Sequence, residues 1–383
     1  MIQLSINTIS EVKLAKKRYV NTREQSFFGN YIYDQVVPDN HFLRRLNQLV
    51  DWERFTDRII ELYQGGGEYG RPPFNPTQLL KMCLLAYFYD LSDRQVEVYV
   101  NENLPAKYFV GLGLDQTAPD HSTLTVFRKR LIKQGDLGVF EVLLAEIVQI
   151  ALTSGIQFGS LQVIDSVHSA ANVNTAKDRG RKDDGKGPRD PDAKWGVKGN
   201  QKAKDRNGQD VDQVKYFFGY KGHVSMNAES NLITSLEVTS GEAYDGHHFC
   251  SLVDQDMAQN IPADTYTADR GYDDGNNHFY LQHLNLQSAI CLKDIRTKKK
   301  DGNKDVWLEL IQSPAYQDGR KERYKIERKF GEAKQGHGLG RCRYLGLLGF
   351  GIQMFFTAMV LNLKRMVKLL TGVGLKTCSV SVS

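Results

Sequence analysis

Three acidic residues stand in contexts that suit chemistry at a highly charged centre. Asp165 follows the apolar run LQVI and Asp269 follows the run TYTA, so each carboxylate would emerge where a buried strand ends. Glu327 lies in the strongly basic sequence GRKERYKIERKFGEAK. A carboxylate buried without a partner is costly, so the two aspartates require a cation, either a side chain or a metal ion.

The three carboxylates together suit a divalent metal site. Mg²⁺ prefers oxygen ligands, and two ions roughly 4 Å apart can clamp both oxygens of an in-line phosphoryl displacement. Taken singly, Asp165 and Asp269 could cap turns, and Glu327 could form exposed ion pairs on a helix. Taken together, they predict a metal-dependent phosphoryl-transfer site.

Two cations accompany Glu327 at helical spacing. Arg323 and Lys334 stand four residues before and seven residues after it, so all three would lie close to one face of a helix. These cations would either hold the phosphates of a nucleic acid or neutralise Glu327.

With these residues the sequence resembles the DDE transposases of bacterial insertion sequences. The family signature Y-x2-R-x3-E-x6-K maps onto Arg323, Glu327 and Lys334, and Arg320 occupies its tyrosine position. The gaps of 103 residues between Asp165 and Asp269, and of 57 between Asp269 and Glu327, are also similar to those of the family. The resemblance runs from about residue 75 to 365 and includes the segments NPTQLLKMCLLAYFYDLSDRQVE, ADRGYDD and GLGRCRYLGL.

The resemblance implies a mixed α/β, RNase H-like central sheet flanked by helices and preceded by an all-α domain. It implies that Asp165, Asp269 and Glu327 bind two Mg²⁺ ions, which Mn²⁺ can replace. The implied reaction is cleavage at transposon ends and transfer of the 3′-hydroxyl into target DNA. The implied partners are terminal inverted repeats, target DNA and further copies of the chain, in the bacterial cytoplasm and on the nucleoid. An RNase H-like nuclease without strand transfer and a catalytically decayed DNA-binding protein remain alternatives.

The composition fits a folded intracellular protein. Of 383 residues, 41% are hydrophobic and 25% charged, as in soluble globular chains. The five cysteines form no C-x-x-C pair, which disfavours a zinc cluster or a disulfide framework. The first residues do not resemble a signal peptide, and the net charge of +5 suits a polyanionic partner without proving one.

The pattern divides the chain into two domains and a tail. Residues 1–155 form a predicted helical domain with possible DNA binding, with helix starts at Asn75, at the capping-box pair Ser92 and Gln95, and at Asp120. Residues 156–370 form the predicted catalytic domain, and 371–383 a tail. The predicted strands of the catalytic domain cover 161–164, 216–224, 233–238, 265–268 and 289–292, and its helices 247–257, 277–284 and an intermittent stretch from about 319 to 370.

A basic loop is predicted at residues 175–213, between the first two strands. Residues 175–206 hold eleven Lys and Arg against six Asp, a charge of +5 that equals the excess of the whole chain. Few apolar residues and many Gly and Pro predict a mobile loop. It is either a solvated insertion or a DNA contact through Lys202, Lys204 and Arg206.

Two further segments invite a functional interpretation. Leu345 to Leu363 contains no charged residue and is long enough to span a membrane, but Gln353, Thr357 and Asn362 interrupt it, so we predict a buried core helix and no membrane. Lys221 and His223 in YKGHV would share one face of a strand, and we interpret them as a surface pair.

Overall fold

The computed structural model describes residues 27–60, 62–63, 73–132, 135–183, 185–204, 208–298 and 304–375. The chain divides into two compact units, a helical unit of residues 1–154 and 359–383 and a sheet unit of residues 155–358. The first boundary lies next to the predicted limit at residue 155, whereas residues 359–370 group with the helical unit and not with the predicted catalytic domain. The functional assignment of the predicted domains stays a prediction.

Several helices of the helical unit begin at residues whose side chains cap them. Its described helices are α2 (Phe27–Val36), α3 (Phe42–Leu49), α4 (Glu53–Ile60), α5 (Pro76–Phe88), α6 (Asp93–Glu102), α7 (Leu104–Val110), α8 (His121–Leu131) and α9 (Gly138–Thr153). Asn75 caps α5, Ser92 and Gln95 form the capping box of α6, and Asp120 caps α8, as predicted. Helices α2, α3 and α4 were not predicted from the sequence.

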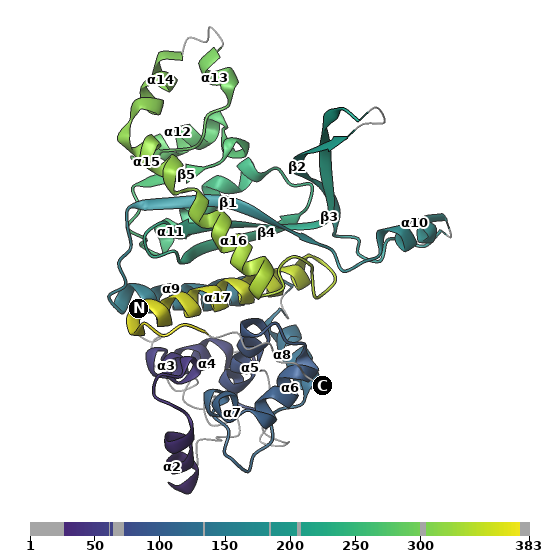
Figure 1. The fold of residues 1–383 in the computed structure, drawn as a ribbon, viewed down its shortest axis with the longest axis vertical. Coiled ribbons are helices and arrows are strands. Elements are labelled where there is room, and N and C mark those ends of the chain that lie inside the picture. The colour runs from purple at the N-terminus through teal and green to yellow at the C-terminus, as the bar shows by residue number, and fades with distance from the viewer. Residues whose placement is uncertain are drawn as a thin grey trace, which may run out of the picture. The chain divides into compact units, whose positions relative to one another are not determined.

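The sheet unit is built around one mixed sheet (Figure 1). Its strands are β1 (Leu161–Ala170), β2 (Lys194–Lys204), β3 (Asp210–Asn227), β4 (Ile233–Ser240), β5 (Thr265–Ala268) and β6 (Gln287–Ser288). Its helical segments are α10 (Thr175–Asp183), η1 (Asp245–His248), α11 (Phe249–Ala258), η2 (Arg270–Tyr272), α12 (Gly275–His283), α13 (Asp294–Lys298), α14 (Lys304–Gln312), α15 (Pro314–Glu322) and α16 (Tyr324–Gly336). Helix α17 (Leu347–Thr371) belongs to the sheet unit up to residue 358 and to the helical unit from residue 359.

The strand order confirms the predicted fold class. Strands β4, β3 and β1 are antiparallel neighbours, and β1, β5 and β6 are parallel neighbours. This succession of antiparallel and then parallel strands, with helices on the sheet, is the RNase H-like arrangement. It places the carboxyl end of β5 beside the middle of β1, which continues to Ala170.

Alternation along the strands decides which helices face which side chains. Ile164 of β1 and Tyr266 of β5 pack in one cluster with Phe249 of α11 and Leu281 of α12. The intervening side chains therefore face the opposite side of the sheet. There α15 packs against β5 and α16 against β1 (Figure 1). A Cβ at Gly319 of α15 would lie 2.6 Å from the Cβ of Ala289, so this glycine permits the close approach of the helix.

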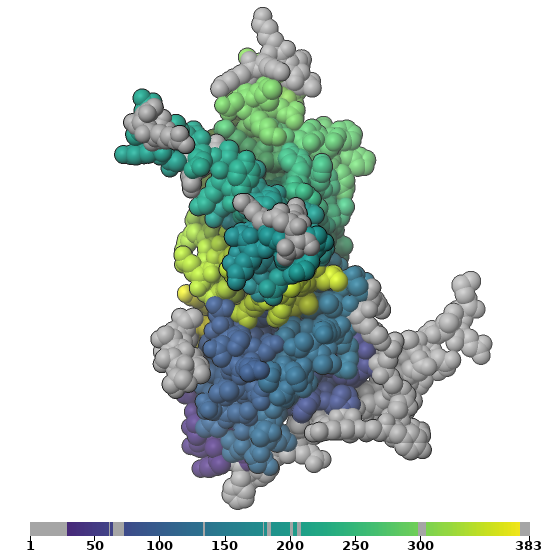
Figure 2. Space-filling view, turned by 90° about the vertical axis from the view of Figure 1, so that its right-hand side faces the viewer, coloured from purple at the N-terminus to yellow at the C-terminus, as the bar shows by residue number. Residues whose placement is uncertain are grey.

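The prediction of a mobile loop at residues 175–213 is wrong over most of its length. Residues 175–183 form α10, and residues 194–204 form β2, which pairs with an extended β3 that starts at Asp210 and not at 216. The outer part of this hairpin, beyond the residues of β3 that pair with β1 and β4, projects from the sheet (Figure 1), and Figure 2 shows the surface of the molecule from the side. Its strands are held by backbone pairing and bury few apolar side chains, so apolar periodicity could not reveal them.

Of two other predictions, the strand at 289–292 is displaced in the structure and the core helix at 345–363 is supported. The predicted strand 289–292 is displaced, because β6 covers only Gln287 and Ser288, although the amides of Ala289 and Cys291 still donate to β5 carbonyls. Helix α17 is the one described helix long and apolar enough to cross a membrane, and 83% of its most apolar 18-residue window is buried within the structure. Buried Gln353 donates to the carbonyls of Gly338 and Arg341, which supports the core interpretation.

Candidate active site

Asp165 lies on β1 beneath α15 and α16. The preceding residue Ile164 is a register partner of Ala268 in the parallel pair of β1 and β5. The Asp165 carboxylate is partly exposed and accepts a hydrogen bond of 2.7 Å at Oδ1 from the backbone N–H of Ser166. Burial, and then the charge of Asp269, raise the pKa of Asp165 to about 7.

Asp269 comes directly after β5 and caps η2. Its Oδ1 accepts a hydrogen bond of 2.7 Å from the backbone N–H of Gly271. Because Ala268 and Ile164 are register partners, Asp269 and Asp165 come directly after the paired parts of two neighbouring strands, whose backbones run about 4.8 Å apart. The structure thus brings the two predicted aspartates together, and after burial the charge of Asp269 contributes to the raised pKa of Asp165.

Arg323 faces this pair of carboxylates from the junction of α15 and α16. Burial lowers the pKa of Arg323, but the neighbouring Cys291, Asp165 and Asp269 raise the pKa by a larger amount, so the net shift is upward. Its Nη1 lies 3.6 Å from the Cys291 sulfur. The predicted cation is therefore close enough to both aspartates for their charges to act on it.

The side chain of Glu327 is more exposed than those of the two aspartates. It is exposed on α16, one turn beyond Arg323, on a helix that packs against β1. Among the described residues, the one group of three potential metal ligands whose donor atoms all lie within 4.8 Å of one another does not include Glu327, Asp165 or Asp269. The convergence of all three carboxylates therefore stays a prediction.

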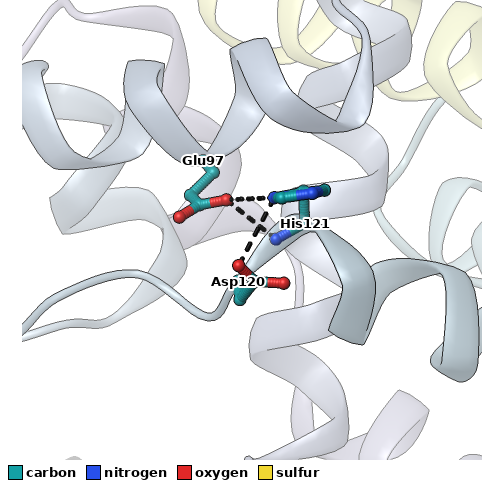
Figure 3. Close-up of side chains that lie close together, drawn as sticks. All are labelled: Glu97, Asp120 and His121. Carbon is teal, nitrogen blue, oxygen red and sulfur yellow. Dashed lines mark hydrogen bonds and ion pairs between the residues drawn. The ribbon is translucent and has the colours of Figure 1, made fainter.

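That one group is Glu97, Asp120 and His121 of the helical unit (Figure 3). Asp120 caps α8 by accepting a 2.6 Å hydrogen bond from the N–H of Ser122. Glu97 Oε2 accepts from the N–H and from Nδ1 of His121, at 2.9 and 2.7 Å. These contacts are those of a helix start, and they account for the cluster without an ion.

Lys334 lies further along α16, among other cations. Burial and the charge of Lys198 lower its pKa. Burial, and then Lys334, Lys198, Lys221 and Lys215, lower the pKa of His168 on β1 to about 4. The charge of Lys334 therefore acts together with those of lysines from the hairpin strands β2 and β3. Lys198 and Lys215 were not predicted from the sequence, because only the pairing of β2 with β3 brings them to this place.

The hairpin cations have local partners. Lys202 and Lys204 are exposed, and their register partners across the ladder are Asp212 and Asp210. Arg206 lies outside the described residues. Arg320, at the tyrosine position of the family signature, is exposed near the end of α15, and Tyr324 is 49% exposed.

Lys221 and His223 are not the surface pair that we predicted. They do share a face of β3, but His223 is fully buried and the Lys221 side chain is only 13% exposed. Lys221 Nζ lies 2.8 Å from Asp245 of η1, a residue that was not predicted from the sequence. No periodic pattern marks Asp245, because it lies in the turn between β4 and α11.

Comparison with known proteins gives two family matches. A family described as "Transposase domain (DUF772)" matches residues 31–130, and one described as "Transposase DDE domain" matches residues 157–363, more than half of the chain. The chain is also similar to the Mos1 transposase paired-end complex with the left transposon end, with 10% identity over 74% of this chain and 85% of that chain. The Mos1 strand transfer complex is 11% identical over 85% of each chain. Both TM-scores are 0.19.

Proposed function

The chain belongs to the family of transposases with a DDE domain, and from that premise we propose that it cuts DNA at transposon ends and transfers the freed 3′-hydroxyl into target DNA. One observation carries the proposal. Asp165 lies within β1, just past the last residue of β1 that pairs with β5, and Asp269 directly follows β5, so the two aspartates are neighbours beside the helix that bears Glu327.

The donor set fits a divalent cation. Burial, and then the neighbouring charge of Asp269, disfavour the ionised form of Asp165 and raise its pKa. We propose that Asp165, Asp269 and Glu327 hold two Mg²⁺ ions, which Mn²⁺ can replace. When bound, such ions activate the attacking oxygen and stabilise the leaving 3′ oxygen of an in-line displacement. The exposed position of Glu327 leaves it free to turn toward the aspartates.

Basic side chains near the carboxylates would bind the phosphates of the DNA. Arg323, already beside both aspartates, is placed to bind the phosphate that reacts. Lys334, together with Lys198 and Lys215, would bind phosphates further along the strand, toward the hairpin. The substrates are double-stranded terminal inverted repeats and target DNA. Pairing two ends calls for a homo-oligomer on DNA, acting in the bacterial cytoplasm on the nucleoid.

Strand transfer separates this function from its first alternative, an RNase H-like nuclease. We expect the protein with Mg²⁺ to join a pre-cut transposon end to plasmid DNA, giving products that retain the labelled 3′ strand on gel electrophoresis. Hydrolysis of the end without joined product would favour the nuclease. Binding of end DNA without cleavage or joining would favour the decayed DNA-binding protein.

The hairpin is proposed to contact DNA phosphates. Reversing the charge of Lys202, Lys204 and Arg206 to Glu should reduce the slope of log affinity against log salt by about 0.9 for each phosphate that the hairpin no longer neutralises, as measured by fluorescence anisotropy with end DNA. The double variant Asp210→Asn, Asp212→Asn is a control in which the change of DNA affinity should have the opposite sign. It removes the carboxylates that face Lys204 and Lys202 in the ladder, so affinity should rise. An unchanged slope in the Glu variant would identify the hairpin as a solvated insertion.

A further inference from the structure

Asp245 opens η1 and reaches β1 from the face opposite to Asp165. Its Oδ2 accepts a hydrogen bond of 3.0 Å from the hydroxyl of Ser166. Its Oδ1 lies 2.8 Å from Lys221 Nζ, which also donates to the carbonyl of Ala243 at 2.8 Å. Asp245 is therefore held by one cation from β3 and holds one side chain of β1.

Ser166 links Asp245 to the candidate metal site. Its backbone N–H donates to Asp165 Oδ1 at 2.7 Å, while its side chain points to the other face of the strand and donates to Asp245. Fixing the Ser166 side chain thus fixes the amide that orients the Asp165 carboxylate. The contact acts just beyond Ile164, the last residue of β1 that pairs with β5.

A second tie joins η1 to the turn that carries Asp269. The buried side-chain amide of Asn277 donates to the carbonyl of Gly246, next to Asp245, and to the carbonyl of Tyr272, at 3.1 and 3.0 Å. Tyr272 closes η2, which Asp269 caps. The Tyr272 ring is fully buried in the core cluster that also contains Ile164. The η1 segment is therefore attached to both of the segments that carry the aspartates.

We propose that Asp245 is a positioning residue of the metal site, which acts through Ser166 on Asp165 and is neutralised by Lys221. The inference rests on the proposed function, because it assumes that Asp165 and Asp269 bind the metal. Both carboxylate oxygens of Asp245 are engaged, one by Ser166 and one by Lys221, so Asp245 is placed to orient a ligand. Groups that orient metal ligands in this way typically change metal affinity about 10-fold to 100-fold when removed.

The test measures binding of Mn²⁺ alone to the full chain, without DNA, by electron paramagnetic resonance of free Mn²⁺. We expect Asp245→Ala to weaken Mn²⁺ binding about 10-fold or more. Ser166→Ala, which removes only the hydroxyl, should weaken it in the same direction and should add little to Asp245→Ala, because both changes break one link. Asp254→Asn is the matched control on α11. It removes a carboxylate that accepts from the Tyr280 hydroxyl, and it should leave Mn²⁺ affinity unchanged.

Two further measurements separate positioning from general stability. The thermal midpoint shows whether each variant is folded at the temperature of the titration, and Ser166→Ala keeps the test available if Asp245→Ala does not fold. If folded Asp245→Ala or folded Ser166→Ala binds Mn²⁺ as wild type does while Asp269→Asn binds it weakly, the positioning role is overturned and the proposed function stands. If Asp269→Asn also binds Mn²⁺ as wild type does, the metal site itself is overturned.

Discussion

The Asp269→Asn protein is expected to cut transposon-end DNA on the order of 10³-fold more slowly than wild type in Mg²⁺, while binding that DNA with nearly unchanged affinity. The substitution keeps the size of the side chain and an oxygen that can still accept the hydrogen bond of the Gly271 amide. It removes the negative charge that, beside Asp165, makes the site suitable for a divalent cation. Cleavage is measured as single-turnover release of the labelled end, and binding by anisotropy in EDTA.

Asp264→Asn is the matched control for this result. Asp264 immediately precedes β5, at the end opposite to Asp269, and is exposed to solvent. Its substitution should leave both cleavage and DNA binding as in wild type. Unchanged cleavage by Asp269→Asn would remove this residue from the site, and a parallel loss of DNA binding would point to a defect of folding or of DNA contact.

The Glu327→Gln protein is expected to lose cleavage on the order of 10²-fold to 10³-fold, again with DNA binding retained. Glu327 is exposed one turn beyond Arg323, so the change should cost little folding stability, because no buried contact of the carboxylate is removed. The loss of rate would come from one missing negative ligand. Single-turnover cleavage in Mg²⁺ and in Mn²⁺ measures it.

Glu332→Gln provides the comparison on the same helix. Glu332 forms an ion pair with Lys329 at 3.5 Å, three residues earlier in the helix, and its removal should leave the cleavage rate within about twofold of wild type. If Glu327→Gln and Glu332→Gln cut equally well, the third carboxylate of the site must be sought elsewhere.

Local chemistry in the sequence predicts much of this fold. The starts of α5, α6 and α8 follow from Asn75, Ser92 and Asp120, because a side-chain cap acts within a few residues of its own position. The ends of the apolar parts of β1 and β5 follow from runs that stop at Asp165 and Asp269. These predictions required no knowledge of distant contacts.

The features that sequence reasoning missed depend on pairing between distant segments. The hairpin of β2 and β3 is exposed, so it carries no apolar pattern, and only the ladder from Lys194 to Lys204 defines it. Lys221 was interpreted as a surface residue because its partner Asp245, 24 positions away, lies in a turn without a pattern. The position of Glu327 relative to the aspartates depends on how α16 crosses β1, which no local spacing determines.

The proposed function depends on one structural claim, that Asp165, Asp269 and Glu327 share divalent ions. The most direct measurement is a crystal structure of the protein with transposon-end DNA and Mn²⁺, with anomalous scattering recorded to locate the ions. We predict anomalous peaks about 2.1 Å from oxygens of all three carboxylates, beside the DNA phosphate to be cut. Peaks that bypass Glu327, or that occur only at Glu97, Asp120 and His121 of the helical unit, would contradict the claim.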